Sequence, residues 1–264
     1  MTTHPFPRDG LRLMGQDAGQ GPPVVFQHGL GGDEAQIAEA FPPVGFRRLT
    51  LECRSHGSSA KGEQFSISMF ADDVLAYADA RGVGRFALGG ISMGAAIASR
   101  LAVIAPERIS SLILVRPAWT WYAAPPNMQV FASLSHYLVN GDRDGFEASD
   151  MAREFAMDAP DNLASLRKFF EIADPANTAL LLSAIATDGP GITQGQLQAL
   201  DIPTLVIGNA VDLVHPLEHA HALAALIPQA HFIEITPKAL DKPRHLTELR
   251  AAISTFLTDQ GSKP

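Results

Sequence analysis

The sequence FALGGISMGAA, from Phe86 to Ala96, joins a short apolar run to a run of small residues. Ser92 stands between them, flanked by Gly90 and Gly94. G-x-S-x-G between a strand and a helix is typical of a tight, strained turn that holds a serine hydroxyl above a sheet. The same letters also suit a glycine-rich turn with an ordinary hydroxyl. A catalytic serine therefore requires a base, an acid and an oxyanion site elsewhere in the chain.

The composition is that of a globular, acidic protein. The 264 residues are 46% hydrophobic and 18% charged, which allows one large α/β core, with or without an inserted lobe. A formal charge of −8 argues against a nucleic-acid partner. Cys53 is the one cysteine; it excludes a disulfide framework, agrees with a reducing compartment and is expected to be buried rather than nucleophilic.

The sequence predicts a cytoplasmic protein with no membrane partner. The first residues lack a basic region followed by an apolar one, so no signal peptide is expected. The most apolar run, residues 94–105, is interrupted by Arg100 and is too short to span a bilayer.

Strand-like and helix-like segments alternate along most of the chain. Runs of strand type occupy residues 23–27, 46–51, 111–115, 204–207 and 231–235 and the run that begins at Phe86, and residues 8–20 are a weak strand or hairpin region. Helix-like segments occupy residues 34–40, 68–80 and 93–104, a stretch from Pro216, and a final stretch with the stripe Leu246, Leu249, Ile253 and Phe256. This alternation predicts an α/β fold with a doubly wound, mostly parallel sheet, whose functional groups gather at the carboxyl ends of the strands.

Residues 117–200 interrupt this alternation, because they carry no strand pattern but several helix-like stretches. One helical face contains Met128, Phe131, Leu134 and Leu138. We therefore predict a core of residues 1–116 and 201–264 with a helical insertion at 117–200. Its aromatic residues suit an apolar pocket and internal packing equally well: Trp119, Trp121, Tyr122, Phe131, Phe169 and Phe170.

The base and its acidic partner are expected in loops that follow strands. His245 follows the last strand, at the start of the final helix, and is predicted to be the base for Ser92. Asp212 follows the preceding strand and is predicted to orient His245, with a turn or cap role as its alternative. The other candidates are placed less well: His4 in a tail, His136 in the insertion, His219 and His221 within a helix, His231 at the amino end of a strand, His215 where it helps to begin a helix, and Asp188 and Asp201 after no strand.

Two backbone N–H groups are predicted to form the oxyanion hole. Met93 follows the serine at the start of a helix and supplies one of them. The glycine-rich loop after residues 23–27 supplies the other, with Leu30 preferred and Gly31 second.

These motifs together resemble the α/β-hydrolase superfamily, in its capped, single-domain branch of small esterases, enol-lactonases, haloperoxidase-like enzymes and C–C bond hydrolases. The matching residues follow the family's order: His28-Gly29-Leu30-Gly31-Gly32, Arg54-Ser55-His56-Gly57-Ser58-Ser59, Gly90-Ile91-Ser92-Met93-Gly94, Asp212 and His245. The resemblance implies a sheet of about eight strands, a helical cap after the sixth and a Ser-His-Asp site without cofactor or metal.

The chain departs from the family at several positions. Ser55 and Glu52 stand where Gly and Asp are frequent, and Arg244 stands where glycine usually precedes the catalytic histidine. Arg244 would lower the basicity of His245, grip an anionic substrate group or lie solvated. Arg116, at the end of its strand, is either a carboxylate anchor or part of a structural ion pair. The candidate substrate-binding residues are Arg116, Trp119 and Trp121.

The sequence predicts a serine hydrolase that cleaves a small carboxylic ester or lactone through an acyl-enzyme, using Ser92, His245 and Asp212. C–C bond hydrolysis of a dienol ketone with the same residues is one alternative. A ligand-binding protein with little turnover is the other. An aspartate nucleophile is disfavoured because the turn carries serine. The expected partner is a small-molecule substrate, with the oligomeric state left open.

Overall fold

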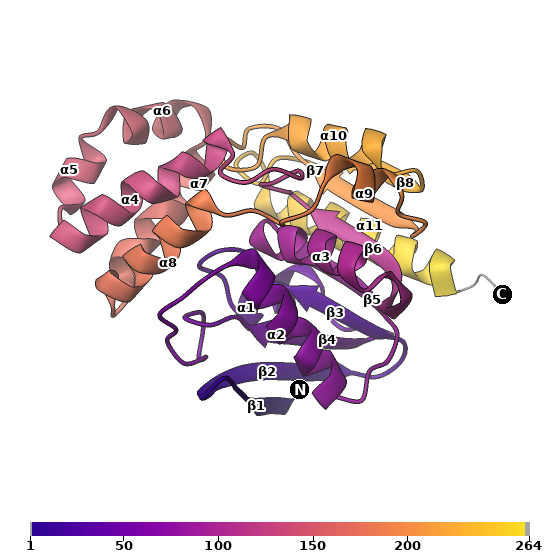
Figure 1. The fold of residues 1–264 in the computed structure, drawn as a ribbon. Coiled ribbons are helices and arrows are strands. Elements are labelled where there is room, and N and C mark those ends of the chain that lie inside the picture. Colours follow the sequence, from indigo (N-terminus) through magenta and orange to yellow (C-terminus); the bar gives the residue numbers. More distant parts are fainter. Residues whose placement is uncertain (1, 262–264) are drawn as a thin grey trace.

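A mostly parallel, eight-stranded sheet flanked by helices confirms the predicted α/β fold (Figure 1). The structure, a computed structural model, describes residues 2–261. The strand order is β1-β2-β4-β3-β5-β6-β7-β8, in which β1, β2 and β4 pair antiparallel and the pairs from β4 to β8 are parallel. The strands are β1 (Thr2–Arg8), β2 (Leu11–Gly19), β3 (Pro23–Gln27), β4 (Arg47–Glu52), β5 (Phe86–Ile91), β6 (Ile109–Val115), β7 (Thr204–Gly208) and β8 (Ala230–Glu234).

The N-terminal strand is the main difference from the predicted elements. Residues 2–8, expected to include a tail at His4, form β1 and pair along their whole length with β2. One side of β1 stays exposed, with Phe6 packed against the core. β1 is an edge strand that pairs only with β2, so residues whose N–H would point away from β2 can be proline, as at Pro5 and Pro7.

Helices cover both faces of the sheet because adjacent residues of its strands point to opposite sides. On one face, Val24 and Phe26 pack with α1 (Glu34–Ala40) and α11 (Lys242–Gly261). On the other, Val25 belongs to the core cluster that includes side chains of α2 (Ile67–Ala80), α3 (Met93–Ile104) and α10 (Leu217–Leu226). The buried, continuously apolar strands follow from this two-sided coverage.

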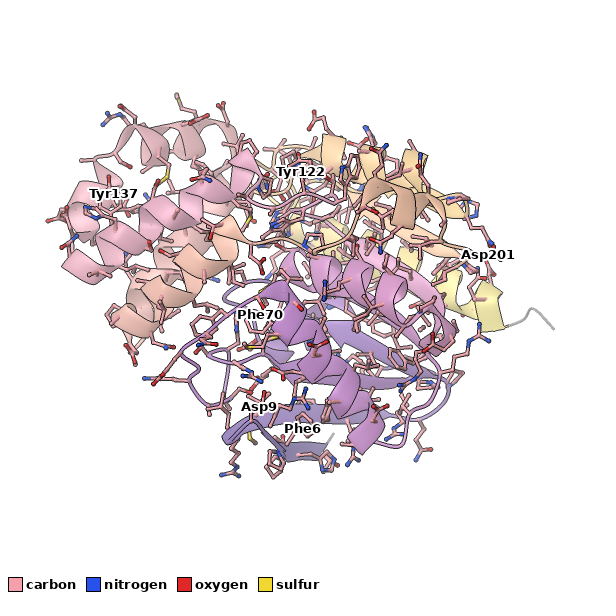
Figure 2. The ribbon with its side chains drawn as sticks, in the orientation of Figure 1. Phe6, Asp9, Phe70, Tyr122, Tyr137 and Asp201 are labelled. Atoms are coloured by element: carbon pink, nitrogen blue, oxygen red, sulfur yellow. The ribbon has the colours of Figure 1, made fainter. Side chains whose placement is uncertain are left out.

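Between β6 and β7, residues 117–200 contain helices and loops and no strand. Helices α4 to α8 lie together beside the sheet, and α9 lies next to α10 (Figure 1). Tyr122 marks the beginning of this segment and Tyr137 lies within α4 (Figure 2). The segment comprises η2 (Pro126–Met128), α4 (Gln129–Asn140), α5 (Arg143–Glu147), α6 (Asp150–Asp158), α7 (Pro160–Arg167), η3 (Lys168–Glu171), α8 (Pro175–Thr187) and α9 (Gln194–Gln198). The short helix η1 (Pro106–Arg108) lies outside it, before β6.

The turn from β5 to α3 brings three backbone segments into close contact. Ser92, in this turn, has φ 57° and ψ −112°, a conformation that L-residues rarely adopt. A Cβ on Gly90 would lie 2.2 Å from the Gly94 carbonyl carbon, and one on Gly94 would lie 2.3 Å from the Gln27 carbonyl oxygen. Glycine is therefore required on both sides of the serine, as the sequence pattern suggests.

No helix among residues 2–261 is both long enough and apolar enough to span a membrane.

We expect Gly94→Ala to lower the free energy of unfolding by about 2 kcal/mol or more, because the new methyl group meets backbone that cannot rotate away. Gly84→Ala is the control, since a Cβ there meets nothing within 4 Å. Urea unfolding of both variants measures the difference. Equal stability of the two variants would contradict the close packing of the turn.

Candidate active site

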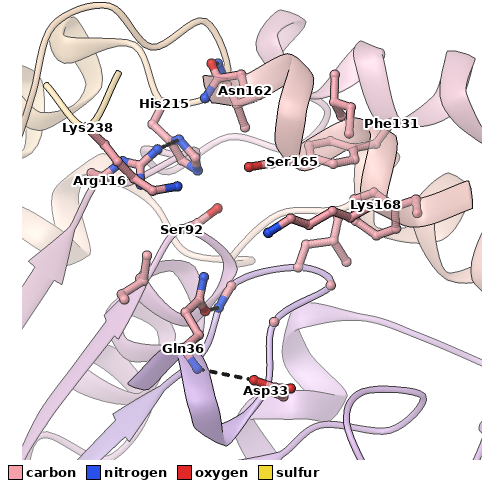
Figure 3. Close-up of a pocket in the computed structure, with 18 of the residues that line it drawn as sticks. Asp33, Gln36, Ser92, Arg116, Phe131, Asn162, Ser165, Lys168, His215 and Lys238 are labelled. Carbon is pink, nitrogen blue, oxygen red and sulfur yellow. Dashed lines mark hydrogen bonds between the residues drawn. The ribbon is translucent and has the colours of Figure 1, made fainter. Parts of the chain in front are cut away.

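A pocket of about 690 Å³ lies at the carboxyl ends of the parallel strands, where the insertion faces the sheet. Residues after β3, β5, β6 and β7 form its floor, and residues of α4, α7 and η3 form the opposite wall. Figure 3 shows the side chains of Ser92, His215, Ser165 and Lys168 directed into the same space. The insertion also contacts the glycine-rich loop, since a Cβ on Gly31 would lie 2.5 Å from the ring of Phe169.

Ser92 is held in the floor of this pocket by its backbone. Its N–H donates to the Val115 carbonyl of β6 at 3.0 Å, and its carbonyl accepts from Ala95 and Ala96 in the first turn of α3. Within residues 2–261, no hydrogen bond engages the Ser92 hydroxyl. The side chain is thus presented to the pocket with its hydroxyl free to rotate.

The carboxylate of Asp212 is shared by two side chains. His215 Nδ1 lies 2.8 Å from Asp212 Oδ1, and the His215 backbone N–H donates to the same oxygen at 3.0 Å. Arg116 donates to the other oxygen through Nε at 2.9 Å and through Nη2. The Asp212 side chain is 1% exposed, so these bonds replace the water that an ionised carboxylate requires.

The contacts of His215 determine its tautomer. Asp212 can only accept, so Nδ1 must carry the proton that it shares with Asp212. The contact from Arg116 Nη2 to this nitrogen, at 3.2 Å, is then a close approach of two donors rather than a hydrogen bond. Neutral His215 therefore has its free lone pair on Nε2, the arrangement of a general base.

The charges around this pair favour an ionised acid and a neutral base. Burial alone would raise the pKa of Asp212, but the charges and hydrogen bonds of Arg116 and His215 hold it well below its usual range. Burial lowers the pKa of His215 below its ordinary 6.5; Asp212 opposes this shift, and Arg116 and Lys238 add to it. At neutral pH the pair is therefore carboxylate and imidazole.

The loop that carries the acid is fixed by the insertion. Asn162 of α7 is 4% exposed, and its Oδ1 accepts from the backbone N–H groups of Leu213 and Val214 at 2.8 and 3.2 Å. A buried side chain of the insertion thus satisfies two donors of the loop between Asp212 and His215. This couples the position of His215 to the position of the insertion.

His245 lies at the start of the final helix, as the sequence indicates, but its imidazole contacts a backbone carbonyl and not Asp212. It is in the first turn of α11, inside the helix, and is 3% exposed. Its Nδ1 pairs with the Thr236 carbonyl at 2.9 Å, whereas the imidazole that contacts Asp212 belongs to His215. Burial lowers the pKa of His245, which suits a neutral ring that donates to a carbonyl. Ser92 and His215 line the pocket, and His245 is not among its lining residues.

The two candidate oxyanion donors flank Ser92. Leu30 lines the pocket, and Met93 is the first residue of α3. Within the described part of the chain, neither backbone N–H donates to an acceptor. His28 holds the Leu30 loop, because its Nδ1 pairs with the Gly29 carbonyl and its Nε2 accepts from the Cys53 N–H.

The proposed substrate-binding residues separate into two groups. Arg116 lines the pocket but is bonded to Asp212, and Arg244 pairs with Glu248 outside the pocket. Trp119 is 2% exposed, with its indole N–H donated to the Asp188 carbonyl at 2.9 Å. Trp121 packs edge-on against Tyr122. Neither tryptophan is among the residues that line the pocket, so both are placed for internal packing.

The remaining candidates have structural roles. Asp188 accepts from the Ile67 N–H at the start of α2, and Asp201 accepts from the side chain of Gln229. Cys53 is buried, and burial raises the pKa of its thiol. Within residues 2–261, no group of three or more His, Cys, Asp or Glu side chains is arranged to hold a metal ion.

The sequence predicts a helix-start role for His215 and does not single out Asn162 or Lys168. The signal for His215 was its position three residues after Asp212, which allows a tight turn to join the two side chains. Pro216 favoured a helix-start role instead. Nothing in the sequence placed Asn162 or Lys168, because their positions depend on how the insertion folds back over the sheet.

A serine on a positive-φ turn between a central strand and a helix, at the carboxyl edge of a mostly parallel sheet, defines the nucleophile-elbow class of α/β proteins. A family model described as alpha/beta hydrolase fold matches residues 22–240, and the chain belongs to this family.

Two curated relatives and one solved structure are similar over most of the chain. The AB hydrolase superfamily protein YisY of Bacillus subtilis (strain 168) is 30% identical over 243 residues, which cover 84% of this chain and 86% of YisY. Lipase 3 of Moraxella sp. (strain TA144) is 27% identical over 219 residues, 81% of this chain and 70% of that protein. The malate-bound esterase of Thermogutta terrifontis has a TM-score of 0.77 at 22% identity, over 98% and 99% of the two chains, a likeness of fold. Relatives of this kind support a hydrolase.

We expect Arg116→Gln to raise the pKa of His215, because the substitution removes a positive charge that disfavours the imidazolium. The histidine ¹⁵N chemical shifts, followed by NMR across a pH titration, measure the change, with His215→Gln providing the assignment. Arg244→Gln is the matched control, because Arg244 does not line the pocket and pairs with Glu248. A pKa that stays constant or falls in Arg116→Gln would contradict the electrostatic role of Arg116.

Proposed function

We propose that the protein is a serine hydrolase of small carboxylic esters or lactones, with Ser92 as nucleophile, His215 as base and Asp212 as its orienting acid. The observation that carries the proposal is the juxtaposition of the Ser92 turn and the Asp212–His215 pair in one pocket. Membership of the α/β-hydrolase family supports the reaction class.

The residues allow a complete acyl transfer. Ser92 Oγ would attack the carbonyl carbon while its proton passes to His215 Nε2. The N–H groups of Leu30 and Met93 would hold the resulting oxyanion, which collapses as His215 returns the proton to the departing alcohol oxygen. A water, deprotonated by the same imidazole, would then attack the acyl-serine and release the acid with Ser92 regenerated.

The choice of base departs from the sequence prediction of His245. A base must present an unprotonated nitrogen to the nucleophile and have its other nitrogen fixed by an acceptor. His215 satisfies the second condition through buried, ionised Asp212, and its Nε2 is the free nitrogen. His245 is bonded to a neutral backbone carbonyl, which supports imidazolium formation less than a carboxylate does.

The insertion would serve as the cap that selects the acyl group. Phe131, Leu166 and Phe169 contribute an apolar wall opposite Ser92. An acyl chain bound at Ser92 would then lie between the sheet and this wall.

Labelling with a fluorophosphonate tests the nucleophile. We expect one adduct by intact-mass analysis in the wild type and none in Ser92→Ala, because only a serine activated by a base reacts rapidly with the phosphorus. Absence of an adduct in the wild type would favour a ligand-binding protein with little turnover. An adduct that persists in Ser92→Ala would place the reactive group elsewhere.

A matched pair of histidine variants tests the base. We expect His215→Gln to lower kcat on short-chain esters by about 100-fold or more, the scale of general-base catalysis, and His245→Gln to lower it by less than about tenfold. Thermal unfolding of both variants checks that the fold is intact. The reverse order of effects would restore His245 as the base and leave His215 as a partner of the acid.

A further inference from the structure

The cations of the pocket differ in whether a carboxylate already neutralises them. Four cationic side chains line it: Arg116, Lys168, Lys238 and Lys242. Arg116 is paired with Asp212, Lys238 with Asp161 at 2.9 Å, and Lys242 with Glu39 at 2.7 Å. In the described part of the chain, Lys168 alone of the four has neither an ion pair nor a side-chain hydrogen bond.

The unpaired ammonium group of Lys168 faces the pocket. It is the first residue of η3, on the insertion side of the pocket, and its side chain extends toward Ser92 (Figure 3). An ammonium group that faces a nucleophile across a pocket can bind an anionic group of the molecule being attacked. The carboxylate of Asp33, which also lines the pocket, accepts from the Gln36 backbone at the start of α1 instead.

The side chains around Lys168 restrict the part of a substrate that would connect a carbonyl at Ser92 to an anionic group at Lys168. The apolar side chains of Phe131, Leu166 and Phe169 line the same wall of the pocket as Lys168. The rings of Phe131 and Phe169 pack edge-to-face, 6.1 Å between centroids. A short aliphatic spacer suits this wall, whereas a second charged group in the spacer would be desolvated without a partner.

We propose that Lys168 forms a carboxylate-binding subsite, so that the substrates are esters or lactones with a free carboxylate at the far end of a short aliphatic chain. This inference rests on the proposed hydrolase function of the same pocket. The sequence indicates Arg116 and Arg244 as residues that could bind an anionic substrate group. Arg116 is paired with Asp212 and Arg244 lies outside the pocket, so the proposal assigns this role to Lys168 of the insertion.

The subsite predicts a selectivity that matched substrates measure. We expect kcat/KM to be about tenfold or more higher for mono-methyl esters of dicarboxylic acids, from succinate to adipate, than for methyl alkanoates of equal length. A factor of this size corresponds to one charge-assisted hydrogen bond. The advantage should fall as salt is added, since the lysine is near solvent.

Substitution at Lys168 tests the residue itself. We expect Lys168→Met to lower the ratio of kcat/KM between the charged and neutral esters by about tenfold, and Lys168→Arg to keep most of it, because the positive charge is retained. Lys61→Met is the control, since Lys61 pairs with Asp174 and does not line the pocket. An unchanged ratio in Lys168→Met, or an equal loss in Lys61→Met, overturns the proposal.

A binding measurement separates this proposal from the hydrolase proposal. Calorimetry with mono-methyl glutarate should detect binding to Ser92→Ala and a loss of about tenfold in affinity in Ser92→Ala/Lys168→Met. If that loss is found but the wild type cleaves no ester, the subsite stands and the hydrolase proposal fails. If the wild type cleaves both ester series and neither the ratio nor the affinity depends on Lys168, the hydrolase proposal stands and the subsite fails.

Discussion

The close approach of three backbone segments at Ser92 is the constraint on which the site depends. Gly94 can pack against the Gln27 carbonyl only because it has no side chain. This contact holds the start of α3 against the end of β3, and Ser92, in the turn between β5 and α3, has a positive φ. The strain is sustained by the hydrogen bond to Val115 and by the buried helix that follows. The same geometry sets the first N–H of α3 beside the hydroxyl.

A second constraint acts on the other side of the pocket, where the buried carboxylate of Asp212 accepts hydrogen bonds from both Arg116 and His215. Arg116 keeps Asp212 ionised, but its charge also opposes protonation of His215. A base must be neutral at rest and must accept a proton during reaction. For His215 as the proposed base, Arg116 therefore favours the neutral resting state and disfavours the imidazolium, so the Asp212–His215 bond would have to compensate for it.

The sheet and its helices could be predicted because they depend on local patterns. α3 begins and ends where the pattern indicates, and the buried strands are apolar because helices cover both faces. β1 could not be recognised, since an edge strand with Pro5 and Pro7 lacks the usual signal. The partner of Asp212 could not be recognised either. It depends on a four-residue turn, preceded by Val211 at φ 59°, that brings His215 back onto the carboxylate.

The insertion links these two constraints to specificity. Asn162 holds the loop between Asp212 and His215, and Lys168 follows it on the same wall of the pocket. A displacement of this wall would therefore shift His215 and the free ammonium group together. A substrate that bridges Lys168 and Ser92 would favour the arrangement in which Asn162 also fixes His215. Binding at the remote carboxylate would then contribute to the position of the base as well as to affinity, so the loss of Lys168 should lower kcat in addition to raising KM for charged esters.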